Sequence, residues 1–339
     1  MEIYQYIINS KKPYLIAEVA DAHYGSVDRA KEMVDLALAS GADAVKFQHH
    51  LPDEEMLKVV PQSKNMQEPL YDFLIKNALN IDQHVDIFNY CLNKGIQYLC
   101  TPFSLAAALE LESNLNLPLY KIGSGELTDL PTLEKIATFG KPIILSTGMS
   151  LEYEIKESYD YLIERKVKLI LMNCTSAYPP NISDLNLGYI KIMQEKFPKA
   201  LIGHSDHTNE IFSSIVAMAY GAKVIEKHVT IDEQLLGPDS DVSITFSQFR
   251  QLSEASKIIE RSISTEKILH ESEKEIQKWA RRSLVYLSEF KKGHVIQSGD
   301  IWGKRPGTGI PSKKYWDYLG RVLKTDVKKN TLVSDEDLL

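Results

Sequence analysis

Residues 200–229 decide the fold; they read "ALIGHSDHTNEIFSSIVAMAYGAKVIEKHV". The apolar runs at 200–206 and 223–229 are typical of buried strands, and the segment between them, 209–222, has the apolar spacing of a helix. Two strands joined by a helix of this length lie parallel in one sheet, because a parallel pair needs a crossover connection. The stretch therefore predicts one strand–helix–strand unit of an α/β protein.

The same unit recurs along the chain. Eight short runs are rich in Val, Ile, Leu, Tyr and Phe, and they are continuously apolar, as in a parallel sheet covered by helices. The runs are 14–19, 43–48, 97–103, 119–124, 142–147, 168–174, 200–206 and 223–229. Eight strands alternating with helices over roughly 240 residues predict a TIM (β/α)₈ barrel. A doubly wound open sheet is the alternative, but no GxGxxG follows the first run to support it.

The character of the sequence changes after the last of these runs. Residues 247–280 are polar with a helical pattern, and we expect a helical linker there. Residues 281–339 contain short strand-like runs separated by Gly, Pro and Lys turns, which predict a small β-rich domain. The expected order is a catalytic barrel over 1–246, the linker over 247–280 and the small domain over 281–339.

Composition and charge narrow the class of protein. The 339 residues are 44% apolar and 25% charged, as in soluble globular proteins, and the net charge of −7 gives no reason to expect a nucleic-acid partner. The chain shows neither a secretory signal nor an apolar run long enough to span a membrane. Three cysteines without CxxC spacing indicate reduced thiols. We therefore expect a cytoplasmic protein that acts on a small molecule, with no membrane partner.

Polar residues gather at the ends of the predicted strands. The active site of a TIM barrel lies at the carboxyl ends of its strands, so these residues are the candidates for substrate binding and catalysis. Ammonium and hydroxyl groups suited to a phosphate or carboxylate come from Lys46, Lys121, Ser124, Ser146, Ser176 and Ser205. Further candidates are Glu18, Gln48, Thr101, Phe103, Glu126, Tyr178 and Asp239. Glu226 and Lys227 lie in the eighth run, and no role is assigned to them.

Two histidines suggest a metal. His207 and His228 end neighbouring strands, where they could hold one divalent ion whose other ligands are water. The alternative for each is a structural histidine held by hydrogen bonds. His49 and His50 cannot both face the barrel mouth, because neighbours on a strand point to opposite faces, and the same rule turns His204 away from the side of His207.

Seven motifs, taken together, resemble one known family. They are "YKIGSGEL", "IILSTGMS", "CTSAYP", "SDHT", "EKHVTID", "GPD" and "KRPGTGI", in this order. They are similar to those of the sialic acid synthases, which comprise the N-acetylneuraminate synthases and their legionaminate and pseudaminate relatives. The resemblance extends from about Tyr14 to the C-terminus. It implies a TIM barrel followed by an antifreeze-like (SAF) domain, and a homodimer in which each SAF domain covers the partner's barrel.

The resemblance also implies an activity. Members condense phosphoenolpyruvate (PEP) with an open-chain N-acyl hexosamine, such as N-acetylmannosamine or a 2,4-diacetamido-trideoxyhexose. The products are a nine-carbon 2-keto-3-deoxy acid and phosphate, and a divalent metal (Mn²⁺ or Mg²⁺) is required. The resemblance also assigns roles to single residues. It implies that PEP is bound by Lys46, Lys121, Ser124, Ser146 and Ser205, and that the metal ligands are His207 and His228. It further implies that the active-site acids are Glu18 and Glu126, that the sugar is bound by Tyr178 and Asp239, and that the partner's SAF domain donates Arg305.

Several residues depart from the family pattern. The first loop reads "EVADAHYG", with Ala20 and Ala22 where the family usually has Gly and Asn. Ser176 stands where some members have Asn, and Asn173 where His is common. Ser240 follows "GPD", as in pseudaminate synthases. These changes leave the sugar open, and two alternatives stand: a related synthase that uses a phosphorylated or non-acylated sugar, and a non-catalytic carbohydrate-binding homologue.

Overall fold

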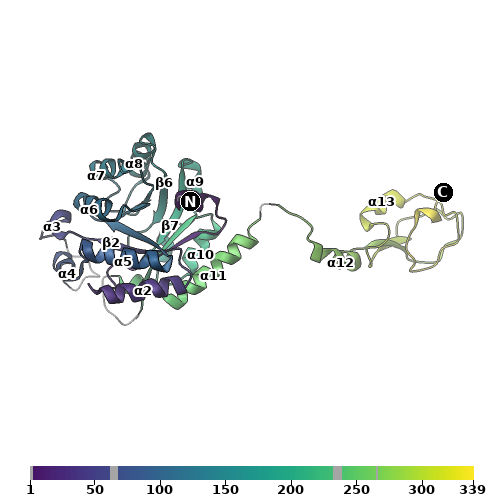
Figure 1. Cartoon of the computed structure of the whole chain (residues 1–339). Helices are drawn as coiled ribbons and strands as arrows, with labels where there is room; N and C mark the ends of the chain where they lie inside the picture. The colour runs from purple at the N-terminus through teal and green to yellow at the C-terminus, as the bar shows by residue number, and fades with distance from the viewer. Residues whose placement is uncertain (1–2, 62–67, 232–238, 265) are drawn as a thin grey trace. The chain divides into compact units, whose positions relative to one another are not determined.

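The computed structural model describes residues 3–61, 68–231, 239–264 and 266–339, which form two compact units, Met1–Ile263 and Ser264–Leu339 (Figure 1). The first unit is built on eight parallel strands. They are β1 (Tyr14–Glu18), β2 (Ala44–His49), β3 (Gln97–Pro102), β4 (Tyr120–Ile122), β5 (Ile143–Ser146), β6 (Leu169–Cys174), β7 (Ala200–Asp206) and β8 (Val224–Thr230). A two-residue strand, β9 (Ile244–Thr245), pairs with β8.

The strands form a nearly closed barrel. Their order is β3-β2-β1-β8-β7-β6-β5-β4, every described pair is parallel, and the two end strands, β3 and β4, contact each other. This arrangement confirms the predicted TIM barrel and rules out the doubly wound open sheet.

Helices surround the barrel, as Figure 1 shows. Those that follow the strands are α2 (Val27–Ala39), α5 (Ile81–Lys94), α6 (Leu105–Leu115), α7 (Leu130–Ala137), α8 (Glu152–Glu164), α9 (Tyr189–Lys196), α10 (Phe212–Ala219) and α11 (Phe246–Ser262). Three more helices are α1 (Ile3–Asn9), which precedes β1, and α3 (Pro52–Glu55) and α4 (Leu70–Asn77), which lie between β2 and α5. Their ends follow local chemistry: the Ser26 side chain accepts a hydrogen bond from the backbone N–H of Arg29 and begins α2, and Gly95 ends α5 at φ 76°.

Alternate strand residues fill the barrel interior. Ile16, Leu99, Ile144 and Ile170 are fully buried there, while their neighbours along each strand pack against the helices. Gly203 lies on the interior side of β7, where an added Cβ would come within 2.4 Å of the Met172 sulfur. The barrel interior is therefore a packed core. Polar side chains that also point inward, at the carboxyl ends of the strands, must converge above this core.

The segment predicted as a linker holds two helices that belong to different units. The first, α11, packs against α10 and α2 of the barrel and buries Phe249 and Leu252. The second, α12 (Glu271–Ala280), lies in the second unit. In the structure, residues 247–262 therefore complete the helical layer of the barrel.

The second unit has a core of its own. Strand β10 (Ser283–Tyr286) pairs antiparallel with β11 (Ile301–Lys304), and isolated bridges add further pairing. Leu284, Tyr286 and Leu323 are buried between these segments and the short helix α13 (Tyr315–Tyr318). The unit is the small β-rich domain that the turn-rich sequence predicts.

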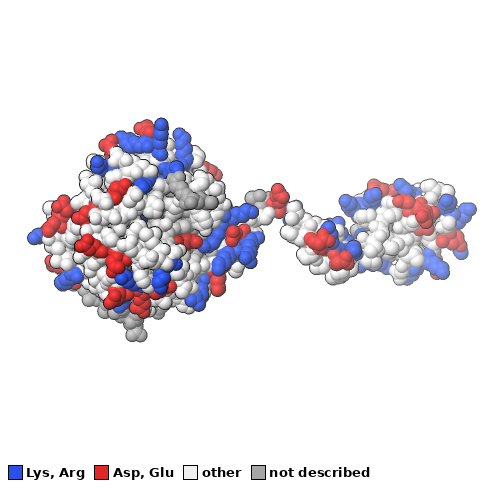
Figure 2. Space-filling model, viewed as in Figure 1, with Lys and Arg blue, Asp and Glu red and all other residues white. Residues whose placement is uncertain are grey.

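Two surface features of the described residues bear on the predicted partners. None of the described helices is long and apolar enough to cross a membrane. On the face shown in Figure 2, Lys and Arg side chains are interspersed with Asp and Glu over the barrel unit. The visible, described part of this face thus lacks the large basic surface that is typical of nucleic-acid-binding proteins.

Candidate active site

The site is built from interior-facing strand positions. Glu18 follows Ile16 by two residues on β1, and Lys46 likewise follows Ala44 on β2. Lys121 of β4 lies two residues after Leu119, which directly precedes that strand. Because the side-chain period of a strand is two, each of these polar residues points into the barrel above an apolar interior residue. Glu226 and His228 extend the same face of β8 beyond Val224.

A buried network of opposite charges lies at the base of the site. Lys46 Nζ lies 2.6 Å from Glu18 Oε2 and 3.4 Å from Glu226 Oε1, and Lys121 Nζ lies 3.4 Å from the same Glu226 oxygen. Ser205 Oγ donates to Glu226 Oε1 over 3.1 Å, and Lys46 Nζ donates to Thr101 Oγ1 over 3.0 Å. Glu226, to which the sequence assigned no role, therefore joins both lysines.

Burial raises the pKa of both carboxylates, and the lysines lower it, but the balance differs between Glu18 and Glu226. Burial raises the pKa of Glu18 to about 7, although Lys46 opposes the shift. Burial also disfavours the charge on Glu226, but Lys121 and Lys46 outweigh it and lower the pKa of Glu226 to about 2. Near pH 7, Glu226 is therefore ionised, while Glu18 is poised to gain or lose a proton.

A cavity of about 390 Å³ opens above this network. Most of the sequence-predicted residues line it: Glu18, Lys46, Gln48, Thr101, Phe103, Lys121, Ser124, Glu126, Ser146, Ser176, Tyr178, Ser205, His207 and His228. Glu226 lines it as well. Of the predicted set, Asp239 is not a lining residue, although its Oδ2 lies 3.7 Å from His228 Nδ1, and Arg305 belongs to the second unit.

The histidine pair faces this cavity. The rings of His207 and His228 lie 5.3 Å apart, and the ring of Tyr178 stacks on that of His207 at 4.3 Å. His207 Nδ1 lies 2.9 Å from the backbone oxygen of Thr175, to which it donates, so Nε2 keeps its lone pair, 3.2 Å from the Tyr178 hydroxyl. His228 Nδ1 is buried and has no hydrogen-bond partner within the part of the chain that the structure describes.

These two imidazoles fit one divalent ion. Burial lowers the pKa of His207 to about 4 and the pKa of His228 well below its usual value, so both rings are neutral near pH 7, as metal binding requires. Among the described residues, no group of three or more His, Cys, Asp or Glu side chains is arranged around one point. An ion held by the pair would take its remaining ligands from water or substrate oxygens, which are the positions that catalytic metal sites leave open.

The other charged residues of β7 and β8 point away from the cavity. Asp206 and Lys227 form a fully buried ion pair at 3.1 Å, and Asp206 Oδ2 also accepts from Ser214 Oγ at 2.6 Å. Asp206 Oδ1 accepts from the backbone N–H of Thr208 at 2.9 Å, which fixes the loop directly after His207. His204 Nδ1 lies 2.9 Å from the backbone oxygen of Asn173, on the outer face of the barrel wall. As alternation requires, His204 therefore faces away from His207.

The first loop explains one departure from the family pattern. Ala20 adopts φ 46°, in the left-handed region where a Cβ atom is strained by about 1–2 kcal/mol, so the usual glycine has a physical reason there. His23 lies in the same loop, and its Nδ1 accepts from the backbone N–H of Gly25 at 3.0 Å.

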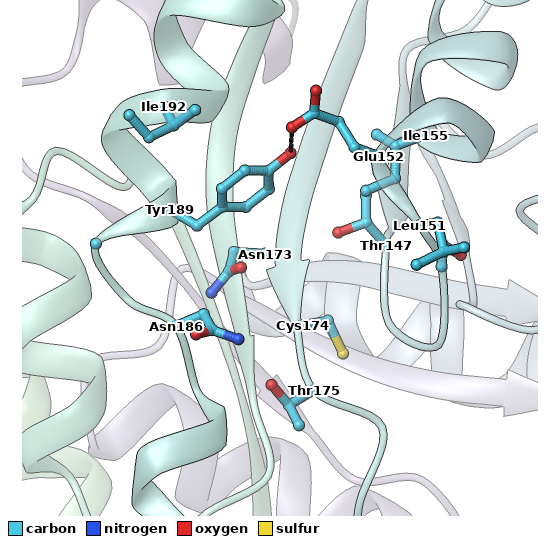
Figure 3. Close-up of a pocket in the computed structure, with 12 residues that line it drawn as sticks. Thr147, Leu151, Glu152, Ile155, Asn173, Cys174, Thr175, Asn186, Tyr189 and Ile192 are labelled. Carbon is cyan, nitrogen blue, oxygen red and sulfur yellow. Dashed lines mark hydrogen bonds between the residues drawn. The ribbon is translucent and has the colours of Figure 1, made fainter.

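A second cavity of about 520 Å³ lies beside the first, between α8 and α9 (Figure 3). Its lining includes Asn173 and Asn186, together with Tyr189, whose hydroxyl donates to Glu152 over 3.0 Å. Of all its lining residues, only Cys174 also lines the first cavity. No Lys, Arg or His is among its described lining residues, so the second cavity lacks the cations and imidazoles of the first.

Arg305 of the second unit is exposed and held locally. Its Nε donates to the backbone oxygen of Ala280 over 3.2 Å, and its guanidinium carbon lies 5.1 Å from the centre of the Trp279 ring. The C-terminal end of α12 thus orients this side chain.

The sequence matches two known families. Residues 33–267 match the NeuB family, and residues 281–339 match the SAF domain. The N,N'-diacetyllegionaminic acid synthase of Campylobacter jejuni is 34% identical over 96% of this chain and 100% of its own length. The pseudaminic acid synthase of Helicobacter pylori is 32% identical over 96% of this chain and 98% of its own length.

A solved structure agrees with these matches. The N-acetylneuraminic acid (sialic acid) synthetase of Leptospira borgpetersenii serovar Hardjo-bovis, crystallised in complex with citrate, superposes with a TM-score of 0.71 at 27% identity. The match covers 78% of this chain and 90% of that one. The resemblance drawn from the motifs is thereby confirmed: the chain belongs to the NeuB family and carries a SAF domain.

Proposed function

We propose that this enzyme condenses PEP with an open-chain N-acyl hexosamine, either N-acetylmannosamine or a 2,4-diacetamido-trideoxyhexose. The products would be a nine-carbon 2-keto-3-deoxy acid and phosphate. The relatives named above are synthases of acids of this kind. The observation that carries the proposal is one cavity that joins two lysines, Lys46 and Lys121, to a pair of neutral imidazoles.

Lysine and serine side chains are the proposed binding groups for PEP. Lys46 and Lys121 provide buried ammonium groups, and Ser124, Ser146 and Ser205 add hydroxyls around the same cavity. Ser146 Oγ is buried and has no hydrogen-bond partner among the described residues, so its hydroxyl can donate to an anion. Donors fixed in advance hold the enol in one orientation without the cost of reorganising water.

The reaction joins C3 of PEP to the aldehyde carbon of the sugar, and the aldehyde oxygen takes up a proton. Water then adds at C2, and cleavage of the C–O bond releases phosphate. Glu18 and Glu126 line the cavity, and burial raises the pKa of both. The pKa of Glu18, about 7, suits proton transfer near neutral pH. A divalent ion, Mn²⁺ or Mg²⁺, would be held by His207 and His228 and would polarise the aldehyde oxygen as a Lewis acid.

Binding of PEP is expected to weaken as pH rises through about 7, because Glu18 then ionises beside the bound anion. Below this pH the Glu18 carboxyl is neutral and does not repel PEP. If only the neutral form binds, the dissociation constant rises about tenfold between pH 6 and pH 8. Calorimetric titration of PEP into the wild type and into Glu18→Gln checks this. The ionisation of PEP itself affects both proteins equally, so parallel pH curves for the two would exclude a role of Glu18.

We further propose that the enzyme is a homodimer in which Arg305 of one chain serves the barrel of the partner, as the resemblance implies. A mixture of Arg305→Ala and Lys121→Ala chains is then expected to regain up to about a quarter of wild-type activity, because random pairing leaves one site intact in half of the dimers. Phosphate release after co-refolding, with mixed dimers verified by mass spectrometry, measures the rescue. Absence of rescue in verified mixed dimers would show that Arg305 acts within its own chain or not at all.

Phosphate release from PEP tests the proposed function directly. The enzyme is incubated with Mn²⁺, PEP and a panel of aldoses that includes N-acyl, non-acylated and 6-phosphorylated hexoses, and products are identified by mass spectrometry. A nine-carbon acid from an N-acyl hexosamine is expected. Turnover of only a phosphorylated or non-acylated sugar would show that the protein is the related synthase. Sugar binding without any phosphate release would show that it is a non-catalytic homologue. A cytoplasmic location and the absence of nucleic-acid or membrane partners stay predictions.

A further inference from the structure

Two adjacent histidines at the end of β2 each bind a glutamate, one on either face of the strand. His49 Nε2 lies 2.8 Å from Glu110 Oε2 of α6, in the helical layer outside the barrel. His50 continues the interior-facing series of Lys46 and Gln48, and its Nδ1 lies 2.8 Å from Glu55 Oε2 of α3. Both rings are buried, but only the second is turned toward the site.

His50 begins a chain of hydrogen bonds that ends at an active-site acid. Its Nε2 lies 3.0 Å from Gln48 Oε1, and Gln48 Nε2 donates to Glu18 Oε1 over 3.0 Å. With the Gln48 amide nitrogen donating to Glu18, the amide oxygen and the Glu55 carboxylate both accept, so both ring nitrogens of His50 donate, as in an imidazolium. Although burial opposes the charge, Glu55, Asp21 and Asp239 outweigh it and raise the pKa of His50.

The same ring supports a second wall of the cavity. The rings of His50 and Phe103 are stacked, with centres 4.4 Å apart and planes 14° from parallel. Gln48 and Phe103 both line the cavity, whereas His50 does not. His50 therefore contacts two lining residues from behind, through a directional hydrogen bond to one and a ring face to the other.

The position of these two residues indicates which substrate they meet. Gln48 lies two residues beyond Lys46 along β2 and is the register partner of Thr101 on β3. Phe103 lies two residues beyond Thr101, so both Gln48 and Phe103 are nearer to the barrel mouth than Lys46. An anion on the lysines would occupy the deeper level, which leaves the level of Gln48 and Phe103 to the second substrate.

We propose that His50, held by Glu55, is a positioning residue for the aldose: it fixes the amide of Gln48 toward Glu18 and the plane of the Phe103 ring. This inference rests on the proposed function. It differs from a purely structural role, because a buried imidazole that only stabilises the fold would affect both substrates and the thermal stability alike. His49 offers the matched control, since it is adjacent, equally buried and bonded to a glutamate at the same distance.

Steady-state kinetics of His50→Leu and His49→Leu separate the two roles. For His50→Leu, the KM for the aldose is expected to rise about tenfold or more, while the KM for PEP stays within about twofold. The Gln48 amide and the Phe103 ring lie nearer to the barrel mouth than Lys46, and the ammonium groups proposed to hold PEP do not contact His50. His50→Gln, which keeps one donor for Gln48, is expected to recover part of the loss. His49→Leu is expected to leave both KM values unchanged. An equal rise in both KM values for His50→Leu, or no rise, overturns the proposal.

A structural measurement tests the positioning role of His50 independently of activity. If no aldose is turned over, the proposed function is wrong, but this measurement still applies. Crystal structures of the wild type and of Glu55→Gln, a milder change at a side chain that is 10% exposed, are compared at Gln48 and Phe103. Rotation of the Gln48 amide away from Glu18, or tilting of the Phe103 ring, supports the positioning role. Unchanged positions of both side chains in Glu55→Gln and in His50→Leu overturn it.

Discussion

Replacing His207 or His228 with alanine is expected to lower turnover about a thousandfold or more, while the barrel stays folded. His207 and His228 are the only imidazoles among the described residues that line the cavity, so loss of either should remove the metal. Polarisation of the aldehyde by a metal contributes several kcal/mol, and about 4 kcal/mol corresponds to three orders of magnitude in rate. Phosphate-release kinetics give the turnover, and electron paramagnetic resonance of Mn²⁺ gives the bound metal.

The matched control for this prediction is His204→Ala. His204 is a fully buried histidine on β7, the strand that His207 directly follows, but it bonds to the backbone oxygen of Asn173 outside the barrel interior. This variant is expected to lose stability yet bind Mn²⁺ as the wild type does. Activity that survives chelation and also survives either cavity-side substitution would contradict a metal role for His207 and His228.

Replacing Lys227 with alanine is expected to lower the free energy of unfolding by about 3–5 kcal/mol. The ammonium group lies 3.1 Å from Asp206, and both side chains are fully buried, so its removal leaves an uncompensated carboxylate in the protein interior. The hydrogen bonds from Ser213 and Ser214 to Asp206 remain, but they do not neutralise its charge. Urea denaturation followed by circular dichroism measures the change.

An exposed ion pair provides the comparison. Lys156 and Asp160 are four residues apart on α8, and their side chains are 65% and 48% exposed. Lys156→Ala is expected to cost less than about 1 kcal/mol, because water screens such pairs. The double variant Asp206→Asn, Lys227→Met should recover part of the loss caused by Lys227→Ala, since no unpaired charge remains. Similar small losses for Lys227→Ala and Lys156→Ala would mean that the buried pair contributes little.

The barrel could be predicted because its strands are continuously apolar. The run 168–174, for example, corresponds to β6 at Leu169–Cys174, and 200–206 corresponds to β7 at Ala200–Asp206. Parallel strands covered by helices have no polar face, so the apolar runs stand out without an alternating pattern. The least accurate boundaries belong to β4, where the predicted run 119–124 includes two loop residues that line the cavity, Gly123 and Ser124, beyond the strand Tyr120–Ile122.

The helix α11 shows why the barrel extends beyond the predicted boundary. Residues 247–280 are polar enough to suggest a linker, because most positions of α11 and α12 face water. The apolar side chains Phe246, Phe249 and Leu252 nevertheless recur three residues apart and pack on the barrel. One apolar stripe on a mostly polar helix is sufficient for the helix to pack on the barrel. The polar composition of residues 247–280 led to the linker prediction in spite of this stripe.

The candidate site was accessible to sequence reasoning where alternation fixes direction. Lys46, Lys121 and His228 share the parity of interior residues on their strands, and that parity brings them to one cavity. Glu226 had the same parity, but its role depends on Lys121, which reaches it from the opposite side of the barrel. For His49 and His50, alternation showed that the two differ in direction, whereas the roles of their partners Glu110 and Glu55 depend on loop and helix packing.

A crystal structure of the wild-type enzyme soaked with Mn²⁺ and PEP tests the central claim most directly. We expect an anomalous peak within bonding distance of a ring nitrogen of both His207 and His228. We also expect the carboxylate and phosphate of PEP to lie on Lys46, Lys121 and the neighbouring serines, in the cavity that these histidines line. Mn²⁺ bound away from both histidines, or PEP bound in the neighbouring cavity between α8 and α9, would contradict this account of the site.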